Sequence, residues 1–425
     1  MTASVHQTEN LLFITLLQLV VMIGAARIMN SALRSMGQPG VVGEIIAGLL
    51  LGPSLFGYFF PGTSQALFGT QASTPITIIS QIGLILLMFQ IGMDFEFGHL
   101  KSRRNTRAVL VTTLFSVGVP FALGLWIGTI SAPILAPSID PVVYSLFLAV
   151  GLAITAVPIL GRILREYDLT RTEIGVIAIS AAALNDVIGW VLLAGVSSYA
   201  AAKFSGAGMA LQVGGLVLFA AACWFLLRPA VDWMVGRTPL RSGEIPANFM
   251  ALVLALMFAM AICTFKLGIF AIFGGFAAGL LFHRHAAFVS AWHRQVGRFV
   301  MVFFLPVFFT YTGLRTNVLG LSNGDIGWLA LILAVAIVSK IVPVYIGGRI
   351  CGFSHTQSSI LGSLMNTRAL MELIVLNIGF NLGFIPQSVF TMLVIMAVVT
   401  TIMTGPILKV LLPRAGHPVP AGVEA

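Results

Sequence analysis

Charged residues are scarce in this sequence. Its 425 residues include 23 basic and 14 acidic ones, a charged share of 9%, whereas 58% are hydrophobic. The mean hydropathy is +1.01. A soluble domain carries charge on about a quarter of its residues, and so few charges cannot cover a surface that faces water. The composition therefore excludes an ordinary soluble protein and predicts that most of the chain is surrounded by lipid.

Cysteine is also rare. Cys223, Cys263 and Cys351 lie far apart without a CxxC spacing, so neither a disulfide framework nor a zinc site is indicated. We interpret all three as apolar filler. No nucleophile, base and orienting group occur at a shared depth. A membrane enzyme is therefore the least favoured class, and no cofactor is indicated.

Hydrophobic runs divide the chain into thirteen predicted transmembrane helices and predict an all-α membrane protein. A spanning helix needs about 20 mostly apolar residues, and clusters of Pro, Gly and charge separate the runs. The predicted spans lie near residues 10–28, 40–59, 76–94, 106–130, 142–164, 173–199, 210–228, 246–265, 269–285, 297–315, 326–350, 358–381 and 386–411. Residues 1–412 form one predicted transmembrane domain, in which the helix at 210–228 links two halves, and 413–425 form a short cytoplasmic tail.

Lysine and arginine indicate the orientation. Loops after odd-numbered helices and the C-terminal tail hold 18 of the 23 basic residues, whereas loops after even-numbered helices hold Lys203, Lys266 and Arg315. Under the positive-inside rule, this asymmetry places the C-terminus in the cytoplasm and the N-terminus outside. The net charge of +9 is thus a topology signal and indicates no nucleic-acid partner. We expect an integral membrane protein of the bacterial inner (plasma) membrane.

Few charges remain inside the predicted spans, and each is expensive at that depth unless it is paired or hydrated. Asp186 lies at the midpoint of its span, next to Asn185, with no opposite charge within a turn. Its carboxylate could bind a proton or a monovalent cation, since hard oxygen ligands suit Na⁺ and K⁺. The alternative is a structural carboxylate neutralised by Lys340.

The other buried charges are basic residues and one glutamate. Lys340, near the middle of its span, could pair with Asp186 or Asn185 and be released when a cation binds. It could equally be a static clamp between helices. Arg368 and Glu372 are four residues apart and share a helix face. We interpret them as a charge-compensating pair rather than as direct ion ligands.

Two spans show signs of interruption. Pro158 removes a backbone donor in the middle of one span, where freed carbonyls and Thr155 would line a polar cavity. The alternative is a plain proline kink. Asn366 and Thr367 mark a break in the other span. The two spans are seven helices apart and run in opposite directions, as expected of an inverted repeat of helices 1–6 and 8–13 with its binding site at the broken helices.

Some titratable residues lie near span ends or in loops. Glu44 is near the start of the second span. His283, His285 and His293 lie outside the predicted spans and could respond to cytoplasmic pH. Their spacing matches no metal-ligand pattern, so we interpret them as solvated loop residues.

Six stretches resemble the monovalent cation:proton antiporters, specifically the branch that includes Kef-type and plant CHX-type cation/proton exchangers. They follow one another along the chain, and the last three are most similar to the CHX-type group. The stretches are QPGVVGEIIAGLLLGPSLFG (38–57), IGLILLMFQIGMDFE (82–96), AITAVPILGRILREYDL (153–169), ISAAALNDVIGWVLLA (179–194), FFLPVFFTYTGLRTN (303–317) and LGSLMNTRALMELIVLNIG (361–379).

The resemblance implies a secondary active antiporter that exchanges K⁺ or Na⁺ for H⁺. It also implies a homodimer, in which each protomer has a dimerisation domain and a mobile six-helix core that moves as an elevator. Two crossing discontinuous helices match the regions around Thr155 and Asn366. The ion-binding aspartate of the family matches Asp186, and its basic core residues match Lys340 and Arg368.

The sequence departs from the family at one site residue and at the C-terminus. Asn185 stands where many electrogenic members carry a first aspartate. We therefore expect an electroneutral 1:1 exchange, although Lys340 could add a second proton. We expect no C-terminal regulatory domain, and hence no control in cis by nucleotide or glutathione.

Two other functions stay open. One is a gated cation channel on the same scaffold, which would pass current without a proton counterflow. The other is a symporter for an organic anion, which predicts more polar residues around the crossing than this sequence has. Carboxylate, hydroxyl and carbonyl oxygens serve both K⁺ and Na⁺, and only the CHX-type likeness favours K⁺.

Overall fold

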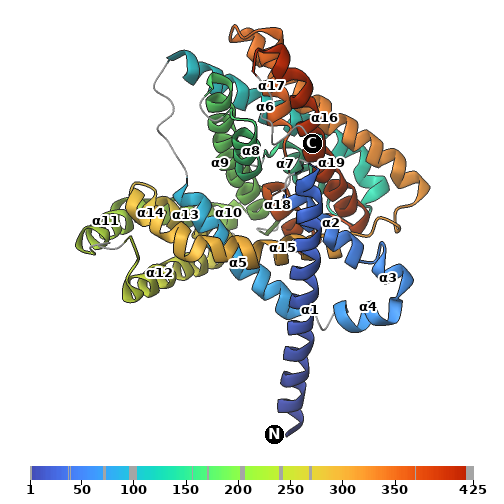
Figure 1. Cartoon of the computed structure of the whole chain (residues 1–425), viewed down its shortest axis with the longest axis vertical. Helices are drawn as coiled ribbons and strands as arrows, with labels where there is room; N and C mark the ends of the chain where they lie inside the picture. The colour runs from blue at the N-terminus through green and yellow to red at the C-terminus, as the bar shows by residue number, and fades with distance from the viewer. Residues whose placement is uncertain are drawn as a thin grey trace. The chain divides into compact units, whose positions relative to one another are not determined.

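A computed structural model describes most of the chain. The described residues are 2–36, 38, 40–69, 73–94, 103–155, 157–169, 172–201, 206–238, 243–267, 270–368 and 370–417. Every regular element within them is a helix and none is a β-strand, which confirms the all-α prediction (Figure 1). The chain forms two compact units, one made of Met1–Ala72, Gly98–Leu193 and Phe309–Ala425, the other of Ser73–Phe97 and Ala194–Phe308.

Nine of the described helices are long and apolar enough to cross a membrane. They are Thr8–Ser35, Gly40–Phe59, Thr74–Met93, Asn105–Leu135, Glu173–Ser197, Gly214–Arg237, Ala247–Lys266, Asn323–Ile350 and Gln387–Arg414. A tenth candidate joins Ala286–Gly297 to Val300–Leu314 with a bend of 43°. The predicted spans at 142–164, 269–285 and 358–381 consist of shorter helices, so the count of thirteen and its topology stay predictions.

The first unit contains the predicted site. Its helices are α1 (Thr2–Ser35), α2 (Gly40–Leu51), α3 (Phe56–Phe59), α4 (Pro61–Phe68), α6 (Arg103–Leu135), α7 (Pro141–Ala153), α8 (Val157–Glu166), α16 (Asn323–Ile350), α17 (His355–Met365), α18 (Leu370–Asn381), α19 (Gln387–Arg414) and most of α9 (Glu173–Ala201) and α15 (Leu305–Leu314). The short helices α7, α17 and α18 are the most deeply buried, whereas α1 exposes apolar side chains such as Phe13, Val20 and Ile28. The interrupted helices therefore form the interior, and α1 presents a face suited to lipid.

Side-chain caps fix where several of these helices begin. Asp140 accepts hydrogen bonds from the backbone N–H groups at the start of α7. Ser322 and Asp325 form a reciprocal capping box at the start of α16, and Ser354 and Gln357 form another at the start of α17. Because the first N–H groups of a helix lack intrahelical partners, such caps set the register of each helix. Three of the helices that build the site are thus positioned by the sequence at their N-termini.

The second unit contains α5 (Ser73–Met93), α10 (Gly206–Ala222), η1 (Cys223–Leu227), α11 (Arg228–Arg237), α12 (Ala247–Lys266), α13 (Ala271–Phe282), α14 (Ala286–Trp292), η2 (His293–Gly297) and η3 (Val300–Phe304). The predicted linking helix continues nine residues past its expected end at 228, through a π-helical turn, to Arg237. Arg228 stacks over Trp224 at 4.4 Å, and Arg237 stacks over Trp233 at 4.1 Å. The positive charge that suggested a helix end at 228 is thus stabilised by a cation–π contact, and the helix continues.

Glycines bring α2 and α15 into backbone contact within the first unit. A Cβ atom on Gly48 would overlap the carbonyl oxygen of Thr310 and would lie 2.8 Å from the Cα atom of Gly313. A Cβ atom on Gly313 would overlap the carbonyl oxygen of Ile45 and would lie 2.8 Å from the Cα atom of Gly48. Only glycine fits at either position, as in other close helix contacts in membranes.

The second unit has an equivalent contact between α5 and α13. A Cβ atom on Gly92 would overlap the carbonyl oxygen of Phe276, and one on Gly279 would overlap the carbonyl oxygen of Phe89. Each Cβ would also lie 3.0 Å from the Cα atom of the opposite glycine. Both units therefore contain a helix pair whose spacing is set by two facing glycines.

Candidate ion-binding site

The first interruption separates α7 from α8. Helix α7 ends at Ala153, and Ile154 follows in an extended conformation with φ −75° and ψ 147°. Thr155 is likewise non-helical and fully buried. Pro158 is the second residue of α8, a position where the N–H group that proline lacks would have no intrahelical partner. The described residues Ile154 and Thr155 are therefore unwound between α7 and α8.

The second interruption separates α17 from α18. Helix α17 ends at Met365, α18 begins at Leu370, and Asn366, Thr367 and Arg368 lie in the non-helical segment between them. The backbone N–H of Asn366 donates to the carbonyls of Gly362 and Ser363, each at 3.2 Å. This shared hydrogen bond tightens the last turn of α17 before the chain leaves the helix.

The two interruptions contact each other directly. The hydroxyl of Thr155 donates a hydrogen bond to the carbonyl oxygen of Met365 at 3.2 Å. Both groups are buried. The unwound Thr155 thus contacts the last residue of α17, 210 positions later in the sequence. At interrupted helices of this kind, backbone groups freed from helical bonding can bind ions.

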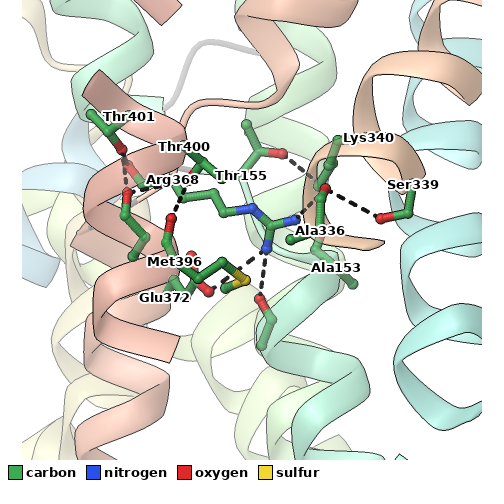
Figure 2. Close-up of polar contacts among 12 residues, drawn as sticks. Ala153, Thr155, Ala336, Ser339, Lys340, Arg368, Glu372, Met396, Thr400 and Thr401 are labelled. Atoms are coloured by element: carbon green, nitrogen blue, oxygen red, sulfur yellow. Dashed lines mark hydrogen bonds and ion pairs between the residues drawn. The ribbon is translucent and has the colours of Figure 1, made fainter. Parts of the chain in front are cut away.

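Lys340 projects from α16 into this junction. Its ammonium donates to the carbonyl oxygens of Ser116 at 2.7 Å and Ala153 at 2.6 Å, and to Thr155 Oγ1 at 2.8 Å (Figure 2). An ammonium has three N–H donors, so all of them are used. The acceptor at Ala153 is the last residue of α7, where helix carbonyls carry partial negative charge. One of these three oxygen acceptors, Thr155 Oγ1, is also contacted by Asn185, and the pairing of Lys340 with Asp186 or Asn185 stays a prediction.

Asn185, on α9, joins the same network. Its amide nitrogen donates to Ser116 Oγ at 3.0 Å and to Thr155 Oγ1 at 3.1 Å. The hydroxyl of Thr155 therefore accepts from both Lys340 and Asn185 while it donates to Met365. Ser116, on α6, was not expected at the site, because a single serine in an apolar helix carries no distinctive signal.

Asp186 follows Asn185 on α9 and is 3% exposed. Helix α9 packs closely against the first interruption, since a Cβ atom on Gly189 would lie 2.8 Å from Cγ1 of Ile154. The carboxylate of Asp186, the amide oxygen of Asn185 and the hydroxyl of Thr155 are hard oxygen ligands of the kind that alkali cations accept. Within the described residues, no three His, Cys, Asp or Glu side chains gather into a metal site.

Arg368 and Glu372 form the second charged pair. The Nη1 atom of Arg368 lies 3.7 Å from Oε1 of Glu372, and both side chains are buried. Figure 2 shows the guanidinium extending from the interruption toward Ala336 of α16, and its Nη groups donate to the carbonyl oxygens of Gly151 at 3.3 Å and Ala336 at 3.2 Å. Thr401 Oγ1 on α19 donates to the carbonyl of Arg368 at 3.0 Å. The arginine therefore ties the second interruption to α7, α16 and α19.

The buried charges of the site are balanced. Lys340 and Arg368 supply two positive charges, and Asp186 and Glu372 supply two negative ones when both carboxylates are ionised. A balanced set of buried charges is far less costly than an unpaired one. Binding of either one proton or one monovalent cation would change the net charge of the site from zero to +1.

Other titratable residues named from the sequence have contacts of their own. In the first unit, Glu44 is buried and its Oε1 accepts a hydrogen bond from Asn30 Nδ2 at 2.9 Å. In the second unit, His293 Nε2 lies 2.7 Å from Asp94 Oδ1, and His293 Nδ1 lies 3.0 Å from Gln90 Nε2. His293 lies in Ala286–Gly297, the first part of the bent tenth candidate span. Lys203 lies outside the described residues.

Comparisons with known proteins support the family expected from the six sequence stretches. Residues 19–414 match the family described as sodium/hydrogen exchanger, transmembrane. The chain is 33% identical over 416 residues to the Na⁺/H⁺ antiporter NhaS4 of Synechocystis, which covers 96% of this chain and 99% of that protein. It is 34% identical over 405 residues to cation/H⁺ antiporter 17 of Arabidopsis thaliana, covering 94% of this chain but 48% of the plant protein, so it spans about half of that relative's length.

A solved structure shares the fold. The sodium proton antiporter MjNhaP1 from Methanocaldococcus jannaschii superposes with a TM-score of 0.62 at 16% identity, over 94% of this chain and 99% of that one. A yeast relative, K⁺/H⁺ antiporter 1 of Saccharomyces cerevisiae, is 29% identical over 394 residues, which cover 89% of this chain and 44% of the relative. The chain belongs to the sodium/hydrogen exchanger transmembrane family.

Proposed function

We propose that this chain is a secondary active antiporter that exchanges a monovalent cation, K⁺ or Na⁺, for H⁺ at one buried carboxylate, Asp186. Family membership supports the class of activity, and relatives named as Na⁺/H⁺ and K⁺/H⁺ antiporters support both cations as candidates. The observation that carries the proposal is the burial of Asp186 beside the hydrogen-bond network that joins two interrupted helices. Carboxylates at such depth mark ion pathways.

Competition for the carboxylate couples the two fluxes. Asp186 binds either a proton or a cation, so each species leaves the site before the other enters. Asn185 and Thr155 contribute neutral oxygen ligands to the cation. Because the hydroxyl of Thr155 accepts two hydrogen bonds in this structure, its use as a ligand requires that Lys340 or Asn185 release it. Lys340 is therefore the charge-compensating group that leaves as the cation arrives.

The charge balance of the site favours an electroneutral 1:1 exchange. The proton-loaded and the cation-loaded site each carry one positive charge more than the empty site, as long as Lys340, Arg368 and Glu372 keep their charges. The inward and outward steps would then move equal charge in opposite directions, so a complete cycle would move no net charge. The buried Arg368–Glu372 pair, with Nη1 and Oε1 3.7 Å apart, compensates charge without acting as a ligand.

The architecture we propose follows the same family pattern. Thirteen helices with the N-terminus outside form an inverted repeat, and the domain at 1–412 ends in a cytoplasmic tail. Pro158, Asn366 and Thr367 keep two helices interrupted at the crossing. The protein acts as a homodimer in the bacterial inner membrane and moves its core as an elevator.

The test uses the purified chain in proteoliposomes loaded with a pH-sensitive dye. The wild type should move protons when K⁺ or Na⁺ is added. A membrane potential imposed across the liposomes should not drive the exchange. Asp186→Asn should abolish this flux. Asp232→Asn, which changes an exposed carboxylate of the second unit, is the matched control and should retain it. Exchange retained by Asp186→Asn, or a cation current without proton movement as in a channel, would contradict the proposal.

A further inference from the structure

The side-chain amide of Asn366 takes no part in the hydrogen-bond network that joins the two interruptions in the described part of the chain, in contrast to the side chains of Thr155 and Asn185. It is fully buried, and within the described residues neither Oδ1 nor Nδ2 has a hydrogen-bond partner. One turn earlier on α17, the hydroxyl of Ser363 is also buried and also lacks a partner among the described residues. Residues three apart share a helix face, so two polar side chains without partners occur together at the end of α17.

The neighbouring polar groups make this contrast informative. The hydroxyl of Thr155 has three partners, and the amide nitrogen of Asn185 has two. Thr367, next to Asn366 in the same interruption, places its hydroxyl 3.5 Å from that of Thr404 on α19. An unpaired buried polar group costs about 1–3 kcal/mol, and native structures leave few of them. An amide kept in this position therefore indicates a ligand rather than packing.

Asn366 is also placed next to the ion site by the chain itself. The residue before it, Met365, accepts the hydrogen bond from Thr155, whose hydroxyl is contacted by both Lys340 and Asn185. Only one peptide unit separates the unpartnered amide from the contact between the two interruptions. The amide thus belongs to the segment that an ion at the crossing would meet.

We propose that Asn366 Oδ1 and Ser363 Oγ bind the transported cation and determine its selectivity. The inference rests on the antiport function proposed above and adds ligands from the second interruption to those from the first. An amide oxygen and a hydroxyl oxygen are neutral hard ligands: they coordinate a monovalent cation but do not take up a proton near neutral pH. They discriminate between cations through their number and field strength, while proton binding remains with Asp186.

This division of roles gives a distinctive kinetic signature. Loss of a neutral ligand raises the apparent KM for cations, by about tenfold for one good ligand, and alters the ratio of KM values among Li⁺, Na⁺, K⁺ and Rb⁺. At cation concentrations well below KM, where competition from the cation is negligible, it leaves the pH of half-maximal exchange unchanged, because the proton-binding carboxylate is intact. A purely structural role would instead lower the amount of folded protein and the maximal rate for all cations alike.

The experiment compares Asn366→Leu and Ser363→Ala with the wild type in proteoliposomes. Ser358→Ala is the matched control, since Ser358 Oγ is another buried hydroxyl of α17 without a partner among the described residues. It faces α16 instead, where a Cβ atom on Gly348 would lie 2.8 Å from that hydroxyl. Asn366→Leu and Ser363→Ala should change the KM ratios, and Ser358→Ala should not.

Two outcomes overturn the inference. One is unchanged KM ratios in both Asn366→Leu and Ser363→Ala; the other is a change of equal size in Ser358→Ala. If Asn366→Leu fails to fold, Ser363→Ala, which removes a single oxygen atom, decides alone. If the proposed antiport function were wrong, the wild type itself would show no cation-dependent proton flux, so that result is distinguishable from a failure of this inference.

Discussion

The hydroxyl of Thr155 is the most connected polar group of the site, and Thr155→Val removes it while nearly preserving the shape of the side chain. The hydroxyl accepts from Lys340 at 2.8 Å and from Asn185 at 3.1 Å, and it donates to Met365 O at 3.2 Å. Valine would leave three buried groups each short of one partner. Lys340 would keep two of its three acceptors, and Asn185 would keep Ser116.

The expected cost of Thr155→Val follows from these contacts. Each buried group deprived of a partner loses about 1–3 kcal/mol, so three of them give a loss of roughly 3–6 kcal/mol, less than strict addition because one substitution affects all three. Thr155→Ser retains the hydroxyl and removes only a methyl group, at about 1 kcal/mol. The two variants therefore separate the hydrogen bonds of this residue from its packing.

Thermal unfolding of the purified protein in detergent measures this difference. Thr155→Val should unfold roughly 2–5 °C below Thr155→Ser, because each kcal/mol shifts the unfolding temperature of a chain of this length by about 1 °C. Exchange in proteoliposomes should fall at least about tenfold in Thr155→Val and stay near the wild type in Thr155→Ser. Equal unfolding temperatures for the two variants would refute the role of the hydroxyl as the junction between the interruptions.

Two further predictions concern packing and pH. Gly313→Ala should destabilise the protein by about 1–3 kcal/mol or more, because its Cβ atom would overlap the carbonyl of Ile45, whereas Gly118→Ala, with nothing within 4 Å of the new atom, should be neutral or stabilising in thermal unfolding. The contact between His293 Nε2 and Asp94 Oδ1 at 2.7 Å is an ion pair only while the imidazole is protonated, so the stability that it contributes is lost as the pH rises and the imidazole loses its proton. The difference in unfolding temperature between the wild type and Asp94→Asn should therefore shrink with rising pH, and a constant difference would contradict this origin.

Part of the fold could be predicted because lipid imposes a simple rule on the sequence. A helix that crosses a membrane must be long and apolar, so the predicted spans coincide with helices such as α16 and α19 to within a few residues at most ends. The segments around Pro158 and Asn366 were distinguishable because proline and a cluster of polar residues are unusual at such depth. The spacing of Arg368 and Glu372 was likewise sufficient to bring their side chains within 3.7 Å.

The partners of Lys340 could not be predicted, for a physical reason. Two of its three acceptors are backbone carbonyls, at Ser116 and Ala153, and every residue has a carbonyl. Sequence reasoning looks for a polar or oppositely charged side chain and therefore offered Asp186 or Asn185. The unwinding of the chain after Ala153 is what makes that carbonyl available, so the contact exists only once the tertiary structure is formed.

The facing glycines provide an independent argument for the proposed inverted repeat. In that repeat, helices 1–6 correspond to helices 8–13, so α2 corresponds to α13 and α5 corresponds to α15. The contact between α2 and α15 in one half is then the counterpart of the contact between α13 and α5. In both pairs, a Cβ atom on either glycine would overlap the carbonyl of the residue three positions before the other glycine. Sequence similarity between the two proposed halves is negligible, but a backbone contact of this kind tolerates only glycine at Gly48, Gly313, Gly92 and Gly279. These are positions at which sterics would preserve the symmetry of the proposed repeat.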